Sequence, residues 1–527
     1  MQSDLKDFSR LRAYFWPVYR SELHKFLPLF LLAFFVGFNY SLLKNMKDAL
    51  MVAAAGAGAE VIPFIKVWGI VPGAVVVTAV YGALSARYPK DVVFYIFLSF
   101  FVAFFAIFVL LIYPSGDSLH LHGLGNKLAG ILPKGLRGFI VMIRYWSYTL
   151  FYVISELWSS IVLSVFFWGL ANDVTTIREA GRFYALINTG LNFSSVVAGE
   201  LSVWVGRQSF IHVPFAKDEW HGAMINLVMM ICLASAAIFY LYRRVHYVGL
   251  AEAFVDASEL VSSKKKSEDK GKSSLKDLFS YVLRSKYLLG LAFIVLAYNL
   301  VNHLFEVVWK DQVSKIYSTA IEYNAYMGRI STLIGVLSVV VAILLTGQTI
   351  RVWGWTFGAL VTPVVAAGFG IVFFLAIFLA KRDINLVPFW HVTPLALSAW
   401  LGGLHNVFTR SAKFTFFDQI KEMAFIPLGA EEKRQGKAAI DGVVSRVGKS
   451  GGSLIYQCLL VFFSSVAASL HIIATALFVI LLAWVVVTIY LGRQIDVFSE
   501  SREATALGKQ EESSPQETVA GTKAILS

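Results

Sequence analysis

Long apolar stretches recur along this chain, and they constrain its fold more than any other feature. A helix needs about 20 mostly apolar residues to cross the hydrocarbon core of a bilayer. The chain is 57% hydrophobic and 15% charged, whereas a soluble protein is about half apolar and a quarter charged. We therefore predict an all-α polytopic membrane protein with twelve transmembrane helices, over residues 26–50, 63–86, 91–113, 138–172, 180–206, 222–243, 287–312, 325–347, 354–380, 387–412, 437–464 and 468–492.

A charged linker, residues 244–286, divides the predicted helices into six and six. Its sequence SSKKKSEDKGKSS is low in complexity and predicts a flexible segment. The two halves show weak self-similarity: Gly181-Arg182 opens the fifth predicted helix and Gly436-Lys437 opens the eleventh. This pattern favours a duplicated, pseudo-symmetric, major-facilitator-like transporter. The predicted regions are a cytoplasmic segment 1–25, halves 26–243 and 287–492 around the linker, and a disordered cytoplasmic tail 493–527.

Lysine and arginine indicate the orientation. They gather in the N-terminal segment, the linker and the stretch 421–437, which the even helix count places on one side, although Lys381 and Arg382 fall on the other. Cytoplasmic loops carry such an excess. We expect a multi-pass inner-membrane protein in the lipid bilayer with both termini cytoplasmic. The net charge of +12 then needs no nucleic-acid partner.

The most informative apolar stretch is YNLVNHLFEVVWK, residues 298–310. At 100° per residue, Asn299, His303, Glu306 and Lys310 share one narrow helix face. A charge in the bilayer costs about 2.5–3.5 kcal/mol, which is tolerable in a bundle interior or a wet cavity. One interpretation is a purely structural ion pair between Glu306 and Lys310. The other is a functional face, in which these residues line a cavity and couple ion binding to transport.

Other predicted helices carry similar polar faces. The fourth has Arg144, Tyr148, Tyr152 and Glu156 at steps of four residues. The eleventh has Lys449, and its GKSGGS segment lacks the spacing of a phosphate-binding loop. Gly448 and Gly452 instead predict close helix packing. The polar residues that we select from the remaining helices are Tyr40 and Lys47 in the first, Asn188 and Asn192 in the fifth, and Arg410 in the tenth.

Basic groups outnumber acidic ones on these faces, which suits a polyanionic solute. Lysine and arginine are the usual phosphate ligands. We predict that Lys47, Arg144, Arg410 and Lys449 line one cavity and bind phosphates. We expect weaker base or ribose contacts from Tyr40, Tyr148, Tyr152, Asn188, Asn192 and Asn299. Composition alone equally allows an organic-phosphate or dicarboxylate carrier.

An enzyme, a channel and a scaffold are the other classes. A membrane enzyme predicts an acid–base or metal cluster near one membrane face. The nearest group is Asp117, His120 and His122, which we interpret as a solvated loop. The two cysteines, Cys232 and Cys458, give no metal spacing. We therefore predict no enzymatic activity, no metal and no cofactor.

Several blocks of sequence resemble the non-mitochondrial ATP/ADP translocase family of plastids and obligate intracellular bacteria. They include NYSLLKNMKDALMV (39–52), SELWSSIVLSVFFWGLAND (155–173), FEVVWK (305–310) and GKAAIDGVVSRVGKSGGSL (436–454). The resemblance covers nearly all of residues 8–495. It implies a twelve-helix major-facilitator-like bundle that carries nucleotides, with functional charges at Lys47, Glu156, Glu306 and Lys449.

Within that family, FSRLRAYFWPVYRSEL, REAGRFYALINTGLN and NHLFEVVWKDQV resemble the chlamydial subgroup that imports nucleoside triphosphates with protons. The resemblance therefore implies import of ATP, GTP, CTP and UTP with protons by alternating access. ATP/ADP exchange, with ADP as a further substrate, is the alternative. Lys44 and His303 depart from what exchangers of the family tend to have. We expect a monomer, with Glu156, His303, Glu306 and Lys310 as the coupling or ion-pair residues.

Overall fold

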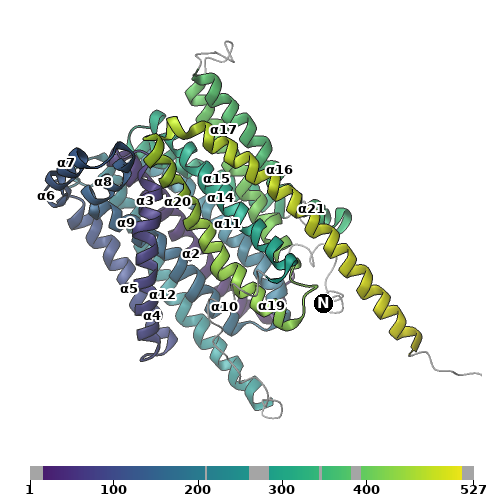
Figure 1. The fold of residues 1–527 in the computed structure, drawn as a ribbon. Coiled ribbons are helices and arrows are strands. Elements are labelled where there is room, and N and C mark those ends of the chain that lie inside the picture. The colour runs from purple at the N-terminus through teal and green to yellow at the C-terminus, as the bar shows by residue number, and fades with distance from the viewer. Residues whose placement is uncertain (1–15, 208–210, 260–283, 343–346, 382–392, 513–527) are drawn as a thin grey trace, which may run out of the picture.

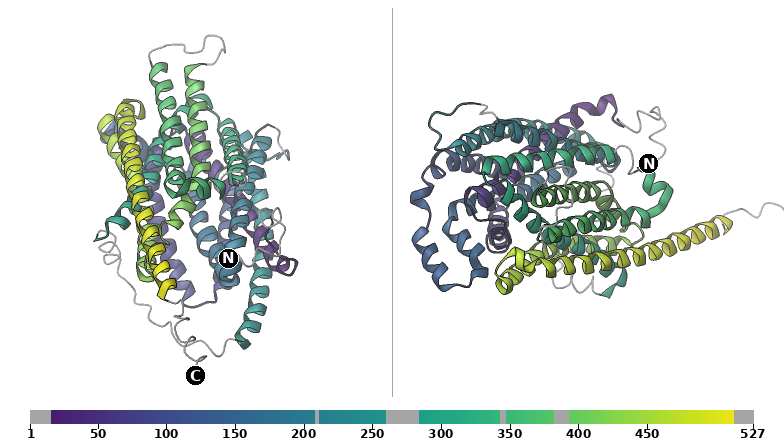
Figure 2. Two further views of the ribbon diagram at one scale, coloured as in Figure 1. Left: turned by 90° about the vertical axis from the view of Figure 1, so that its right-hand side faces the viewer. Right: turned by 90° about the horizontal axis from the view of Figure 1, so that it is seen from above.

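A computed structural model of the chain describes residues 16–207, 211–259, 284–342, 347–381 and 393–512. The described elements are helical and form one bundle (Figure 1; Figure 2 shows two further sides). The N-terminal helices are α2 (Leu23–Asp48), α3 (Val61–Phe64), α4 (Val71–Ser85), α5 (Lys90–Ile107), α6 (Gly116–Leu119), α7 (His122–Ile131), α8 (Arg137–Arg144), α9 (Trp146–Trp158), α10 (Trp168–Val174), α11 (Ile177–Arg207) and α12 (Glu219–Glu259).

The C-terminal helices follow the linker. They are α14 (Lys286–Ile316), α15 (Ala320–Val341), α16 (Gly347–Ala380), α17 (Pro394–Ala412), α18 (Asp418–Met423), α19 (Ala430–Lys437), α20 (Ser445–Phe463) and α21 (Val466–Glu512). The two groups are called the N-terminal set and the C-terminal set below. They contact each other most extensively along α11 and α15.

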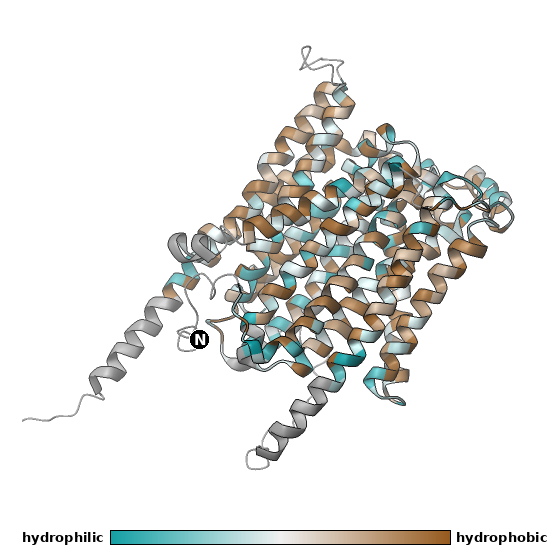
Figure 3. Ribbon diagram, turned by 180° about the vertical axis from the view of Figure 1, so that it is seen from behind, coloured by the Kyte–Doolittle hydropathy of each residue, from teal (hydrophilic) through white to brown (hydrophobic). Residues whose placement is uncertain are grey.

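Nine helical stretches of the described chain are long and apolar enough to cross a membrane. Each lies at a predicted span, and apolar residues dominate the outer faces of the bundle (Figure 3). Three further helices, α11, α17 and α20, lie at the other predicted spans but carry more polar residues. The structure thus shows a polytopic all-helical fold, and the count of twelve spans stays a prediction.

Several helix ends differ from the prediction. The fourth span starts at Trp146, not at residue 138, because the chain breaks at Tyr145 with φ −103° and ψ 51°. Helix α12 continues to Glu259 in the predicted linker, and α21 continues to Glu512 in the tail predicted to be disordered. Both extensions contain many alanine and glutamate residues, which favour continued helix. Residues 260–283 and 513–527 lie outside the described chain.

The segment 114–137 is helical rather than a loop, although Asp117 and His122 are exposed as predicted. It forms α6, α7 and a short 3₁₀ turn at one end of the bundle. His120 is buried, its Nε2 lies 2.9 Å from Ser147 Oγ, and burial lowers the pKa of its imidazole. Asp117 instead pairs with Lys217 at 2.5 Å. These partners indicate a structural cap, and no group of three metal-ligating side chains occurs among the described residues.

Local π-helical segments interrupt the long helices and change the direction of their side chains. They occur after α2 (η2, Ala49–Ala54), before α4 (η3, Ile65–Ile70), after α5 (η4, Phe108–Ile112), within the fourth span (η6, Ser159–Phe167), after α17 (η8, Lys413–Phe417) and before α20 (η9, Ala438–Val444). Each adds a residue to a turn, so a face counted at 100° per residue drifts there. Three of these segments, η3, η8 and η9, contribute residues to the cavity described next.

Candidate functional site

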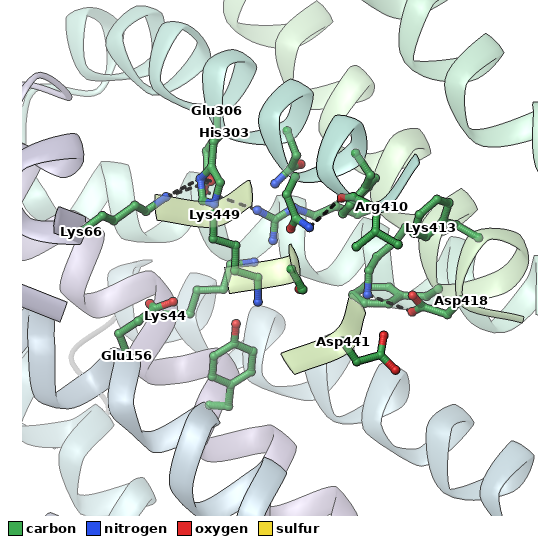
Figure 4. A pocket seen from close by; sticks show the side chains of 18 of the residues that line it. Lys44, Lys66, Glu156, His303, Glu306, Arg410, Lys413, Asp418, Asp441 and Lys449 are labelled. Carbon is green, nitrogen blue, oxygen red and sulfur yellow. Dashed lines mark hydrogen bonds and ion pairs between the residues drawn. The ribbon is translucent and has the colours of Figure 1, made fainter. Parts of the chain in front are cut away.

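A polar cavity of about 340 Å³ lies between the two helix sets (Figure 4). Its walls come from α2, η3 and α9 on one side and from α14, α17, η8, α18, η9 and α20 on the other. Its described lining contains seven cationic and five acidic side chains: Lys44, Lys47, Lys66, Arg410, Lys413, Lys421 and Lys449 against Asp48, Glu156, Glu306, Asp418 and Asp441.

Glu306 is a buried carboxylate of the cavity lining that contacts three cations. One of its oxygens lies 2.8 Å from Lys310 Nζ and 3.3 Å from Arg410 Nη2, and the other lies 3.6 Å from Lys66 Nζ. The i,i+4 pairing of Glu306 with Lys310 is therefore present. Three cations stabilise one buried carboxylate as its ionised form.

A buried ion pair beside this carboxylate joins the two helix sets. Lys310 Nζ of α14 lies 2.7 Å from Asp48 Oδ2 of α2, and the two side chains are 1% and 0% exposed. Lys47 lies 3.2 Å from the other oxygen of Asp48 and 3.3 Å from Glu156. A chain of charges therefore runs from Glu156 in the N-terminal set to Glu306 in the C-terminal set.

Lys66 is a cavity residue that our sequence analysis did not select. Its Nζ lies 2.8 Å from His303 Nδ1. An ammonium group only donates hydrogen bonds, so Nδ1 is the acceptor and this imidazole is neutral with its proton on Nε2. The sequence signal was a single lysine in the apolar stretch 61–85. A lone lysine forms no polar helix face, because no second charged residue lies one turn before or after it.

Acidic partners hold two further lysines of the cavity lining. Lys413 pairs with Asp418 at 2.8 Å, and Lys421 pairs with Asp441 at 2.6 Å. Neither lysine was selected as a site residue from the sequence. Their acidic partners lie five and twenty residues away in the chain, and only the fold shows that these pairs face the cavity.

The predicted glycine face on α20 is confirmed. A Cβ added to Gly448 would lie 2.9 Å from Asn299 Cβ, and one added to Gly452 would lie 3.2 Å from His303 Cβ. Both contacts are with α14, so small residues let the two helix backbones approach closely. This packing brings Lys449 to the cavity wall.

The predicted phosphate ligands Lys47, Arg410 and Lys449 line the cavity, whereas Arg144 does not. Arg144 ends α8 and donates from Nη2 to Asn126 Oδ1 at 2.8 Å. The prediction assumed one continuous helix from Arg144 to Glu156. The break at Tyr145 separates Arg144 from that helix and turns it toward α7. Its placement in the cavity was wrong.

Among the predicted base or ribose contacts, Tyr40, Tyr152 and Asn299 line the cavity. Tyr148 does not, and it stacks instead on Tyr113 and Tyr145 with ring centroids 5.7 and 5.9 Å away. Asn188 and Asn192 also lie outside the lining, on α11 where it packs along α2 and α15. The predicted coupling residues Glu156, His303 and Glu306 line the cavity, while Lys310 lies buried behind it.

One end of the cavity is closed by contacts between the helix sets. Gln457 of α20 donates to Pro63 O at 2.8 Å and accepts from Trp68 Nε1 at 3.2 Å. Nearby, a Cβ on Gly135 would clash with the backbone at Leu460 and Val461. The pairs at Lys413 and Lys421, toward the opposite end, stay within the C-terminal set.

Comparison with known proteins places the chain among transporters. A family model described as "TLC ATP/ADP transporter" matches residues 1–495. The chain is 60% identical over 515 residues to ADP,ATP carrier protein 2 of Chlamydia pneumoniae, covering 96% of this chain and 95% of the relative. It is 36% identical over 467 residues to the chloroplastic ADP,ATP carrier protein 1 of Arabidopsis thaliana, covering 88% and 73%.

A solved structure shares the fold at low sequence identity. The crystal structure of a bacterial homologue of the iron transporter ferroportin, in its inward-facing state, superposes with a TM-score of 0.52 and 13% identity. It covers 90% of this chain and 100% of that one. This likeness concerns the fold alone. Because the family model matches residues 1–495 and a relative that is 60% identical covers 96% of the chain, the chain belongs to the TLC ATP/ADP transporter family, a family of multi-pass membrane proteins.

Proposed function

We propose that this chain imports nucleoside triphosphates across the inner membrane together with protons, by alternating access. The observation that carries this proposal is the surplus of cations in a cavity lined by both helix sets. Surplus positive charge inside low-dielectric walls attracts a polyanion. In this proposal Lys47, Arg410 and Lys449 bind phosphates, and Tyr40 and Tyr152 contact the base or ribose.

Two packing relations support twelve spans in two related halves. Helix α2 packs along α11 and α12, and α14 packs along α20 and α21. A six-helix unit repeated once in the chain predicts this correspondence between its first, fifth and sixth helices. In the proposed orientation, with both termini cytoplasmic, the end closed by Gln457 faces away from the cytoplasm.

The proposed mode of transport is net import with protons rather than exchange. A nucleoside triphosphate carries about four negative charges, and entry against an inside-negative potential costs about 2.3 kcal/mol per net charge per 100 mV. Net import therefore needs accompanying positive charge, whereas exchange needs a nucleotide leaving the cell. The Glu306 and Glu156 carboxylates are the proposed proton-binding groups.

Uptake of labelled ATP into cells expressing the protein tests this mode. We expect uptake without internal nucleotide and its loss when a protonophore dissipates the proton gradient. Cells carrying the empty vector control for endogenous uptake. Uptake that requires internal nucleotide and tolerates the protonophore would instead establish ATP/ADP exchange.

We also expect the base to be held by stacking rather than by hydrogen bonds to its edges. The aromatic rings of Tyr40, Tyr152 and Tyr298 line the cavity, and stacking accepts any base. GTP, CTP and UTP should each compete with labelled ATP within about thirtyfold of unlabelled ATP, because stacking contributes about 1–3 kcal/mol per base and this range spans about 2 kcal/mol. Competition by adenine nucleotides alone would contradict this prediction.

A further inference from the structure

The cavity lysines divide into paired and unpaired groups. Lys47, Lys66, Arg410, Lys413 and Lys421 each lie within 3.6 Å of a carboxylate oxygen. The remaining two, Lys44 and Lys449, have no side-chain hydrogen bond or ion pair within the described chain. Both line the cavity, and Figure 4 shows both side chains reaching into it.

These two lysines belong to opposite helix sets. Lys44 is on α2 and Lys449 is on α20. Lys44 lies one turn before Lys47 and Asp48, so the buried charge pairs fix the helix that carries it. The close packing of Gly448 and Gly452 on α14 fixes the helix that carries Lys449.

An unpaired ammonium group is the preferred ligand for an incoming phosphate. Binding at a paired lysine must first break or weaken its ion pair, whereas binding at Lys44 or Lys449 breaks none. Two like charges in one cavity also repel each other, and an anion between them removes that repulsion. Lysine offers three donors on a mobile stem, so two lysines can hold the oxygens of one polyphosphate.

We propose that Lys44 and Lys449 together form a polyphosphate site that bridges the two helix sets. This inference rests on the proposed function and adds Lys44 as a substrate-binding residue. A ligand that contacts both sets binds most tightly when the sets approach, so its binding favours the closed cavity.

Binding measurements on the purified full-length protein in detergent test the site. Inorganic tripolyphosphate is the probe because it carries the phosphates without base or ribose, and ATP is measured alongside it. We expect Lys44→Gln and Lys449→Gln each to weaken both ligands about thirtyfold, the loss that corresponds to one charged hydrogen-bond partner. The double variant should show coupling between the two positions, since they share one ligand.

Lys90→Gln is the matched control, because it removes one positive charge outside the cavity, where Lys90 is 74% exposed and pairs with Asp173. The melting temperature of the ligand-free protein separates binding from structural roles. It should not fall in Lys44→Gln, since no ion pair is lost there. A fall in melting temperature with unchanged tripolyphosphate affinity would overturn the inference.

The outcomes also separate this inference from the proposed function. If the wild type accumulates ATP but Lys44→Gln binds tripolyphosphate like the wild type, the bridging site is wrong and the transport proposal stands. If the two variants lose tripolyphosphate binding but the wild type shows no proton-driven uptake, the site stands and the transport mode is wrong. Independent, uncoupled losses in the double variant would also contradict a shared site.

Discussion

Replacing Lys310 by methionine is expected to lower the free energy of unfolding by about 3 kcal/mol, the low end of the range for breaking a buried ion pair. Lys310 lies 2.7 Å from Asp48 and 2.8 Å from Glu306, and it is 1% exposed. The low end applies because each carboxylate keeps another cation. Asp48 retains Lys47 and Glu306 retains Arg410. Equilibrium unfolding in mixed micelles measures the change.

A double-mutant cycle identifies the cause of that loss. Combining Lys310→Met with Asp48→Asn removes both charges and should recover part of the lost stability, giving a coupling energy above about 0.5 kcal/mol. The exposed pair of Lys90 with Asp173 is the control, and Lys90→Met should change stability by less than about 1 kcal/mol. Simple addition of the two single losses would show that the Asp48–Lys310 pair does not hold the helix sets together.

Replacing Glu306 by glutamine is expected to abolish proton-driven accumulation of nucleotide while leaving nucleotide binding measurable. In the present conformation three cations hold the Glu306 carboxylate. A phosphate that binds Arg410 weakens the contact of Arg410 with Glu306, so fewer positive charges oppose protonation of this carboxylate. Glutamine keeps the shape of the side chain but cannot carry that proton. Uptake driven by an imposed pH gradient and binding in detergent measure the two properties separately.

The uptake experiment on Glu306→Gln also tests the alternative role of Glu306 as a structural counter-ion. If the glutamine variant still concentrates nucleotide on an imposed pH gradient, Glu306 is a permanent counter-ion for Lys310 and Arg410. Glu156→Gln is the matched variant, because Glu156 also lines the cavity but is 32% exposed and has Lys47 at 3.3 Å. Loss of gradient-driven uptake in that variant alone would assign the proton to Glu156.

The protonation state of His303 bears on which group carries the transported proton. In the structure its Nδ1 accepts from Lys66, so a second proton on the ring requires this bond to break. Lys66 belongs to the N-terminal set and His303 to the C-terminal set. The proposed assistance of His303 in proton binding therefore requires Lys66 to move away from Nδ1.

The sequence by itself determined the class of protein and much of the C-terminal side of the cavity. Hydrophobic length predicted a polytopic helical fold, because only helices satisfy every backbone group in lipid over such stretches. Helical periodicity placed Asn299, His303 and Glu306 on one face, and all three line the cavity. Periodicity is reliable there because α14 is one continuous helix of 31 residues.

Only the tertiary structure decided which charges meet across helices. Periodicity assigns a side chain to a face of its own helix and says nothing of the partner that this face meets. It could not predict that Lys310 pairs with Asp48 of α2, or that Lys66 reaches His303. Periodicity also failed at Arg144. The backbone break at Tyr145 ends the helix that carries Arg144, so Arg144 does not share a helix face with Glu156. Backbone breaks and helix packing depend on contacts between residues that are distant in the chain. These contacts decide which side chains line the cavity.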